Sequence, residues 1–136
     1  MPAPEDLDPD MQYVWGLRYI DDLVLRDRDT SGNGTLDERL YALQDANWNV
    51  VALADSDGDV VERYLYSAYG DPLVLNADFA EDSDGTDYAW EFRFTGRRTD
   101  LETELMYYRN RMYHPGLGRF VSRDPGNFDP WRPRRG

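Results

Sequence analysis

Two Asp-Pro steps place two carboxylates five residues apart in the stretch RDPGNFDP, at Asp124 and Asp129. A neighbouring carboxylate pair can do the chemistry of an aspartyl protease, because one group ionises to activate water while the other stays protonated and donates to the scissile carbonyl. The same residues are typical of turns, since proline fixes φ and aspartate caps the backbone. We favour the turn, and self-cleavage by Asp124 and Asp129 is the alternative.

A second stretch, DRDTSGNGTLDE at 27–38, carries oxygen ligands at the spacing of an EF-hand calcium loop. Gly32 would make its sharp turn. The ligands at loop positions 1, 3, 5 and 12 would be Asp27, Asp29, Ser31 and Glu38. Gly34 stands where a Leu or β-branched residue is usual, and the preceding DDLVLR resembles a strand rather than a helix. We therefore expect a hairpin loop, with a Ca²⁺-stabilised binding or adhesion module as the alternative.

The composition excludes several other kinds of site. The chain has no cysteine and one histidine, His114, so thiolate catalysis, disulfides, Cys-based zinc sites and His-rich metal sites are excluded. No Ser or Cys at a suggestive spacing would complete a catalytic triad with His114. The net charge of −12 opposes non-specific nucleic-acid binding. We expect no cofactor beyond the calcium alternative, and no nucleic-acid partner.

The elements that would position these residues are β-strands. Ten Tyr, four Trp and five Phe favour strands, and short apolar runs are separated by Gly, Asn, Asp and Pro. The clearest hairpin joins two Val-rich runs across Asp57-Gly58, a dipeptide that suits a type I′ turn. We predict an all-β meander of antiparallel hairpins. Its strands are expected near 12–19, 22–27, 39–45, 49–56, 60–69, 88–96 and 118–124.

The remaining segments are polar. We expect an acidic, disordered tail over 1–11, an acidic loop over 76–87 and a flexible tail over 127–136. Thr99 and Glu102 have the spacing of a capping box, which allows a short helix near 99–105. There is no apolar run long enough to span a membrane, and the start MPAPEDLDPD lacks the pattern of a signal peptide.

Three stretches resemble a known family. They are YVWGLRYIDDLVLRDRD (13–29), RLYALQDANWNVVALADSDGDVVERYLYSAYGDP (39–72) and FRFTGRRTDLETELMYYRNRMYHPGLGRFVSRDPG (92–126). Together they resemble the Rhs repeat-associated core domain of the Rhs/YD-repeat proteins, which include polymorphic toxins, toxin-complex shell subunits and the animal teneurins. Within a β domain at 12–126, residues 60–72 resemble one YD repeat and 92–126 the core motif.

The resemblance rests on particular residues, and the sequence departs from the family pattern at others, among them Ser67 and Glu104. Ser67 stands where the family usually has the Asp of YDxxG, and Glu104 replaces a usual Gly. The residues that carry the match are Tyr64, Tyr66, Tyr69, Gly70, Phe94, Thr95, Gly96, Tyr108, Arg109, Arg111, Tyr113, Pro115, Gly118, Arg119, Phe120, Ser122, Asp124 and Pro125.

The resemblance implies a structural role. Hairpins of this family wind into a curved β-sheet shell, and the core domain closes one end of a shell that encloses a C-terminal toxin. The expected partners are preceding YD repeats or a C-terminal effector, and exposed strand edges could drive self-association. The family suggests an exported or cell-surface protein. It also implies that Asp124-Pro125 resembles the first element of a self-protease whose second element has no match here. The chain holds about one YD unit plus the core motif, which is too short to build a shell, so we expect a fragment, an isolated cap or a degraded relative.

Overall fold

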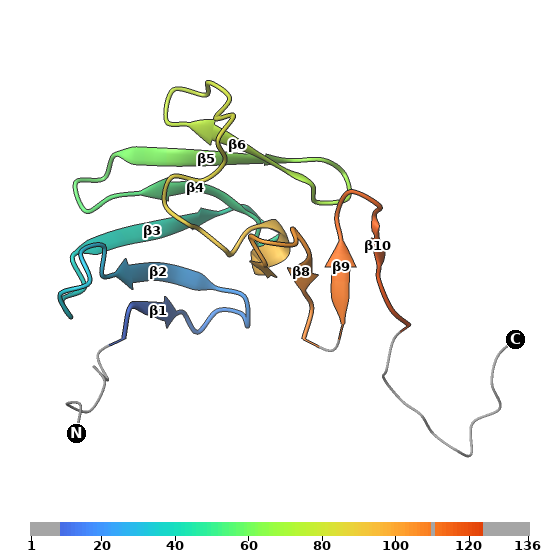
Figure 1. Ribbon diagram of the computed structural model, residues 1–136, viewed down its shortest axis with the longest axis horizontal. Helices are drawn as coiled ribbons and strands as arrows, with labels where there is room; N and C mark the ends of the chain where they lie inside the picture. The colour runs from blue at the N-terminus through green and yellow to red at the C-terminus, as the bar shows by residue number, and fades with distance from the viewer. Residues whose placement is uncertain (1–8, 110, 124–136) are drawn as a thin grey trace, which may run out of the picture.

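The computed structural model describes residues 9–109 and 111–123, and there the chain is all-β, as the sequence predicts (Figure 1). Six strands form an antiparallel sheet in which each strand pairs with the next along the chain. A second, smaller antiparallel sheet has the order β10-β9-β8-β7. The strands of the large sheet are β1 Met11–Trp15, β2 Leu23–Arg28, β3 Glu38–Gln44, β4 Val50–Ala54, β5 Val60–Tyr66 and β6 Pro72–Asn76. Those of the small sheet are β7 Arg98–Thr99, β8 Met106–Tyr107, β9 Met112–His114 and β10 Arg119–Phe120.

Three hairpin loops of the large sheet, at 45–49, 55–59 and 67–71, share one five-residue design. In each, the first N–H donates to the fifth carbonyl and the fourth N–H donates to the first carbonyl, at 2.9–3.1 Å. The side chain of the first residue accepts the N–H of the fifth. The fourth residue is left-handed, with φ of 64° at Trp48, 85° at Gly58 and 92° at Gly70. Local hydrogen bonds therefore set these turns.

The core lies on one face of the large sheet, where the connection after β6 crosses it. Trp90 on that connection is fully buried. The buried apolar side chains packed with it are Leu23, Leu40, Val50, Leu53, Tyr64 and Val74. Arg26 is also fully buried, with its guanidinium carbon 5.0 Å from the centre of the Trp90 ring. It donates to the carbonyls of Tyr88 (2.8 Å) and Ala89 (3.2 Å), which holds the crossing connection on the sheet.

Two local features, the helix that the sequence allows at 99–105 and the strand that it predicts at 88–96, do not form. No helix forms at 99–105: Thr99 pairs with Met106 in the β7–β8 hairpin, and Asp100 accepts the N–H of Glu104 with its carbonyl and donates its own N–H to Leu105. Glu104 has a φ of 62°, which a right-handed helix cannot contain. A strand does not run over 88–96 either. Phe92 makes a single bridge with Arg98, and a 3₁₀ turn, η1 Phe94–Gly96, follows with Thr95 left-handed.

Within the described residues, no helix has the length and apolar character that crossing a bilayer demands.

Candidate functional site

The loop at 27–38 is organised by the protein's own donors. One Asp29 carboxylate oxygen accepts the N–H groups of Ser31 (3.0 Å) and Gly32 (2.8 Å), and the other accepts that of Gly34 (2.8 Å). Asp37 accepts the N–H and the hydroxyl of Thr30, at 2.7 and 2.5 Å. These bonds make a capped hairpin turn between β2 and β3.

The outer two calcium candidates of this loop are paired with arginines. Asp27 accepts two hydrogen bonds from Arg39, at 2.7 and 2.9 Å, and these bonds lower the pKa of the Asp27 carboxyl. Glu38 accepts from Arg26 and Arg28, at 3.0 and 3.1 Å. The structure thus engages Asp27, Asp29 and Glu38 separately, and calcium binding at 27–38 stays a prediction.

The three carboxylates that the structure does bring together are Glu62, Asp82 and Asp87, the one such group among the described residues, with oxygens within 4.8 Å of one another. Glu62 is buried and accepts the Tyr64 hydroxyl, the Thr86 hydroxyl (2.8 Å) and the Asp87 N–H (3.0 Å). The charge of Asp82 and partial desolvation raise the pKa of Asp87. Because three donors satisfy Glu62, this cluster serves to anchor the 82–87 loop on β5.

The family-motif residues gather where the two sheets meet. Gly70, which ends the YD-like unit, has a φ of 92°, and a Cβ there would lie 2.4 Å from the Phe94 ring. Gly118 in the β9–β10 turn has a φ of 65°, and a Cβ there would lie 2.7 Å from the Tyr69 ring. Tyr113 donates its hydroxyl to the carbonyl of Tyr69 at 2.7 Å. We call these contacts, together with those of the next paragraph, the seam.

Aromatic rings extend the seam on the side of the small sheet. Tyr108, Tyr113 and Phe120 pack edge to face with ring centres 5.3–5.5 Å apart. The Tyr108 hydroxyl lies 2.8 Å from the Thr95 hydroxyl, and burial raises the pKa of Tyr108. On the side of the large sheet, Tyr66 packs on Phe94, with the two ring centres 5.7 Å apart. The motif therefore encodes the packing of one sheet on the other.

The other motif residues lie around the seam. The guanidinium of Arg111 stacks over the Phe120 ring at 3.4 Å. Arg109 is left-handed, with a φ of 61°. Arg119 and Ser122 are exposed. The motif residues Asp124 and Pro125, and with them Asp129, lie outside the described residues, so the carboxylate pair stays a prediction.

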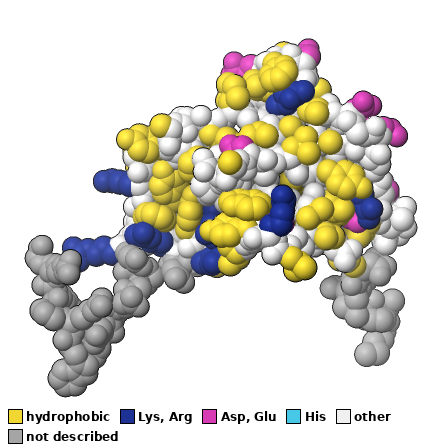
Figure 2. Space-filling view, turned by 180° about the vertical axis from the view of Figure 1, so that it is seen from behind, with side chains coloured by type: hydrophobic (Ala, Val, Ile, Leu, Met, Phe, Trp, Pro, Cys, Tyr) yellow, Lys and Arg dark blue, Asp and Glu magenta, His cyan; other side chains and the backbone are white. Residues whose placement is uncertain are grey.

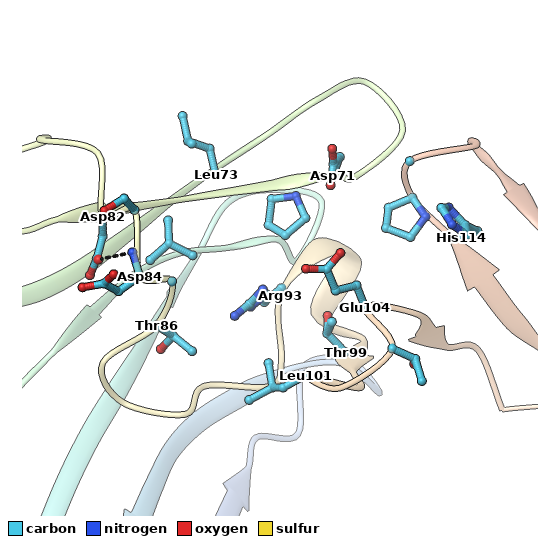
Figure 3. A pocket seen from close by; sticks show the side chains of 17 residues that line it. Asp71, Leu73, Asp82, Asp84, Thr86, Arg93, Thr99, Leu101, Glu104 and His114 are labelled. Carbon is cyan, nitrogen blue, oxygen red and sulfur yellow. Dashed lines mark hydrogen bonds between the residues drawn. The ribbon is translucent and has the colours of Figure 1, made fainter.

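A pocket of about 540 Å³ opens beside the seam, between the start of β6, the loop at 82–86, the β7–β8 hairpin and the β9–β10 turn (Figure 3). His114 and Pro115 form one wall. His114 Nδ1 accepts the N–H of Leu117 at 3.1 Å, which leaves Nε2 to carry the proton of a neutral ring. Four acidic residues line the same pocket: Asp71, Asp82, Asp84 and Glu104.

The positive group of this pocket is Arg93, near the middle of its lining (Figure 3). Only 7% of Arg93 is exposed. Its guanidinium lies 5.6 Å from the centre of the Tyr64 ring, and its Nε is buried without a hydrogen-bond partner. None of the ion pairs and side-chain hydrogen bonds among the described residues involves the Arg93 guanidinium.

Sequence reasoning missed both Glu62 and Arg93 as buried charges. Glu62 lies in the alternating run VVERYLY, and its own face of β5 also carries the buried Tyr64. That neighbour is a signal that could have placed Glu62 on the inner face. The sequence around Arg93 gave no comparable signal of burial. Residues 92–94 (FRF) lie in an irregular connection, whose burial depends on the small sheet rather than on an alternating pattern.

Comparison with known proteins gives partial matches of sequence. The chain is 37% identical over 81 residues to the tRNA(Glu)-specific nuclease WapA of Bacillus subtilis subsp. natto, covering 59% of this chain and 3% of that protein. It is 36% identical over 81 residues to the tRNA nuclease WapA of Bacillus subtilis strain 168, with the same coverage. The uncharacterised protein YlbH of Escherichia coli K12 is 30% identical over 76 residues, which is 56% of this chain and 29% of YlbH. No protein-family model matches the chain.

Comparison with solved structures supports the fold. The crystal structure of TcdB2-TccC3 matches 74% of this chain and 5% of that one, with a TM-score of 0.58 and 23% identity. The TcdB2-TccC3-TEV structure matches 86% and 6%, with a TM-score of 0.56 and 20% identity. This chain thus spans a small part of each relative. The matches support a loose relation to the Rhs-type toxin and toxin-complex proteins, consistent at a coarse level with a structural module.

Proposed function

We propose that this chain is a structural module of Rhs/YD-repeat type, in which the core motif closes a hairpin sheet and forms part of a shell or its cap around a C-terminal effector. The observation that carries the proposal is the seam. Gly70 and Gly118 are left-handed, and each lies against an aromatic ring of the other sheet's segment, at Phe94 and Tyr69. The motif residues thus serve packing, and the described ones form no nucleophile–base pair.

The surface also fits a part of a larger assembly. Leu65 and Leu73 are direct cross-strand neighbours on β5 and β6, and they are 54% and 40% exposed. Figure 2 shows apolar side chains over much of one face, with arginines among them. Large apolar groups exposed together favour burial against another surface. Among the described residues, β1 has no strand on its outer side, and β6 has only the bridge from Leu75 to Glu81. In the proposed shell, neighbouring repeats would pair with the free parts of these edges.

The experiment uses the whole encoded protein, with limited proteolysis followed by mass spectrometry. The substitution Gly118→Ala places a methyl group against Tyr69 and strains a left-handed residue, so it should open the seam. Opening the seam should expose the strands of the small sheet to cleavage at lower protease concentration. The matched control is Gly32→Ala, which is also left-handed (φ 71°) but has open space around its Cβ. Equal protection in wild type and Gly118→Ala would contradict the capping role.

A further inference from the structure

We propose that the pocket around Arg93 binds the carboxylate of an extended peptide segment, and that its acidic rim selects a segment with a basic residue beside that carboxylate. This inference goes beyond the structural function proposed above and does not depend on it.

The first step is the charge of Arg93. Arg93 is 7% exposed and has no ion-pair partner among the described residues. A buried cation of this kind is costly, and a bound anion offsets that cost. The guanidinium prefers planar anions that accept two parallel hydrogen bonds, and a carboxylate has this geometry. Arg93 therefore points to a carboxylate ligand.

The second step is pre-organisation. The backbone of Arg93 is held at both groups: its N–H donates to the Arg97 carbonyl at 2.9 Å, and its carbonyl accepts from Val50 at 3.1 Å and from Gly96 at 3.0 Å. Its side chain rests on the Tyr64 ring. A side chain fixed in this way loses little freedom when a ligand binds, so little of the binding energy is lost to ordering.

The third step is selectivity. Asp71, Asp82, Asp84 and Glu104 line the same pocket, and Figure 3 shows Arg93 between Asp84 on one side and Glu104 on the other. Such a rim repels polyanions such as nucleic acid, because like charges are brought close in a partly desolvated space. It attracts a ligand that carries a cation next to its carboxylate. An Asp or Glu beside Arg or Lys has this pattern.

The fourth step is the kind of ligand. Pro72 and Leu73 line the pocket from β6, the last strand of the large sheet. Further along β6, Leu75 is bridged to Glu81 and the Val74 carbonyl accepts the Asp82 N–H, so among the described residues the outer edge is open only beside Pro72 and Leu73. Open strand edges accept extended peptides through main-chain hydrogen bonds. Leu101 and Pro115 offer apolar contact to the flanking side chains. A peptide segment therefore fits better than a small free acid.

The test titrates the full chain with the probe peptide acetyl-Gly-Asp-Arg-Gly-amide by calorimetry at low salt. We expect a Kd of about 1 mM or tighter. Acetyl-Gly-Asn-Arg-Gly-amide, which lacks the carboxylate, should bind about tenfold more weakly, and so should acetyl-Gly-Asp-Gln-Gly-amide, which lacks the guanidinium. No binding, or equal binding of the Asp and Asn peptides, overturns the proposal.

Variants locate the site. Arg93→Gln should abolish binding, and Arg93→Lys should weaken it because a single ammonium cannot form the paired hydrogen bonds. Glu104→Gln should selectively weaken the Asp-Arg peptide. Glu102→Gln, an exposed acid of the same hairpin outside the pocket, is the matched control. If Arg93→Gln does not fold, the NMR signal of the wild-type Arg93 Nε–H decides: the Asp-Arg peptide should shift it, and an unmoved signal overturns the proposal.

The same titration separates two sources of the ligand. The residues after 123 include Asp124 and Asp129 together with Arg132, Arg134 and Arg135, so this chain itself carries the required chemistry. If its own segment competes for the pocket, the Asp124→Asn/Asp129→Asn chain should bind the probe more tightly than wild type does. Equal affinity assigns the ligand to another molecule. Both results support the pocket.

Discussion

Replacing Ser67 with aspartate tests whether the hairpin loops share one stabilising device. In the loops at 45–49 and 55–59 the first residue is Asp, and one of its oxygens accepts two N–H groups. The acceptor at Asp45 binds Asn47 (2.9 Å) and Asn49 (3.1 Å), and that at Asp55 binds Asp57 (3.0 Å) and Asp59 (2.9 Å). The loop at 67–71 has only one of the two bonds in this pattern.

In the loop at 67–71, the Ser67 hydroxyl accepts one N–H, that of Asp71, at 3.0 Å. Ser67→Asp should keep this bond and add a second from the Tyr69 N–H. A net intramolecular hydrogen bond contributes about 0.5–1.5 kcal/mol, and Ser67 is exposed, so we expect a gain of about 1 kcal/mol. For a domain of this size, that gain raises the Tm by about 3–5 °C.

The assay is urea and thermal unfolding followed by circular dichroism on wild type, Ser67→Asp and two controls. Asp55→Ser makes the reverse change in a sister loop and should lose about 1 kcal/mol. Ser67→Asn supplies the same acceptor oxygen without adding charge, which separates the hydrogen bond from repulsion in a chain of net charge −12. The loops are not equivalent if Asp55→Ser lowers the free energy of unfolding while Ser67→Asp leaves it unchanged or lowers it.

Four further outcomes are expected. Glu104→Gly should raise stability by about 0.5–1 kcal/mol because residue 104 is left-handed (φ 62°), whereas Glu102→Gly in the same hairpin should lower it; unfolding midpoints check both. The Tm should be the same with Ca²⁺ as with a chelator, because arginines pair with Asp27 and Glu38. A rise in Tm with Ca²⁺ that Asp29→Asn abolishes would establish the calcium module instead. The charge of Asp82 raises the pKa of Asp87 in the folded state, so ionised Asp87 destabilises the fold once the pH rises above the pKa of Asp87 in the unfolded chain. Asp87→Asn should therefore raise the Tm at pH 7 but not at pH 3. An equal gain in Tm at both pH values would refute the charge effect. Intact mass should stay constant over days of incubation, and fragments that Asp124→Asn abolishes would establish self-cleavage.

The local features of the fold follow from short stretches of the sequence. Alternating apolar residues and Asp, Gly and Asn clusters predicted the hairpins, and a turn does form at Asp57-Gly58. The predicted type I′ turn is wrong, however, because only Gly58 is left-handed and the turn is the five-residue loop 55–59. The motif glycines also stood in the sequence, and their left-handed φ is a local property. Where a stretch had two local readings, as at 99–105, the choice depended on the pairing of Thr99 with Met106.

The seam and the pocket depend on contacts between segments that are far apart in the chain. Tyr69 meets Tyr113 across 44 positions of the chain, and Asn49 accepts the N–H of Thr95 across 46. Arg93 lies in an irregular connection, and its burial depends on elements that arrive before and after it in the chain. Periodicity reports which face of one strand is apolar, but it carries no information on which distant segment covers that face. The candidate site is therefore a product of packing between the two sheets rather than of any single motif.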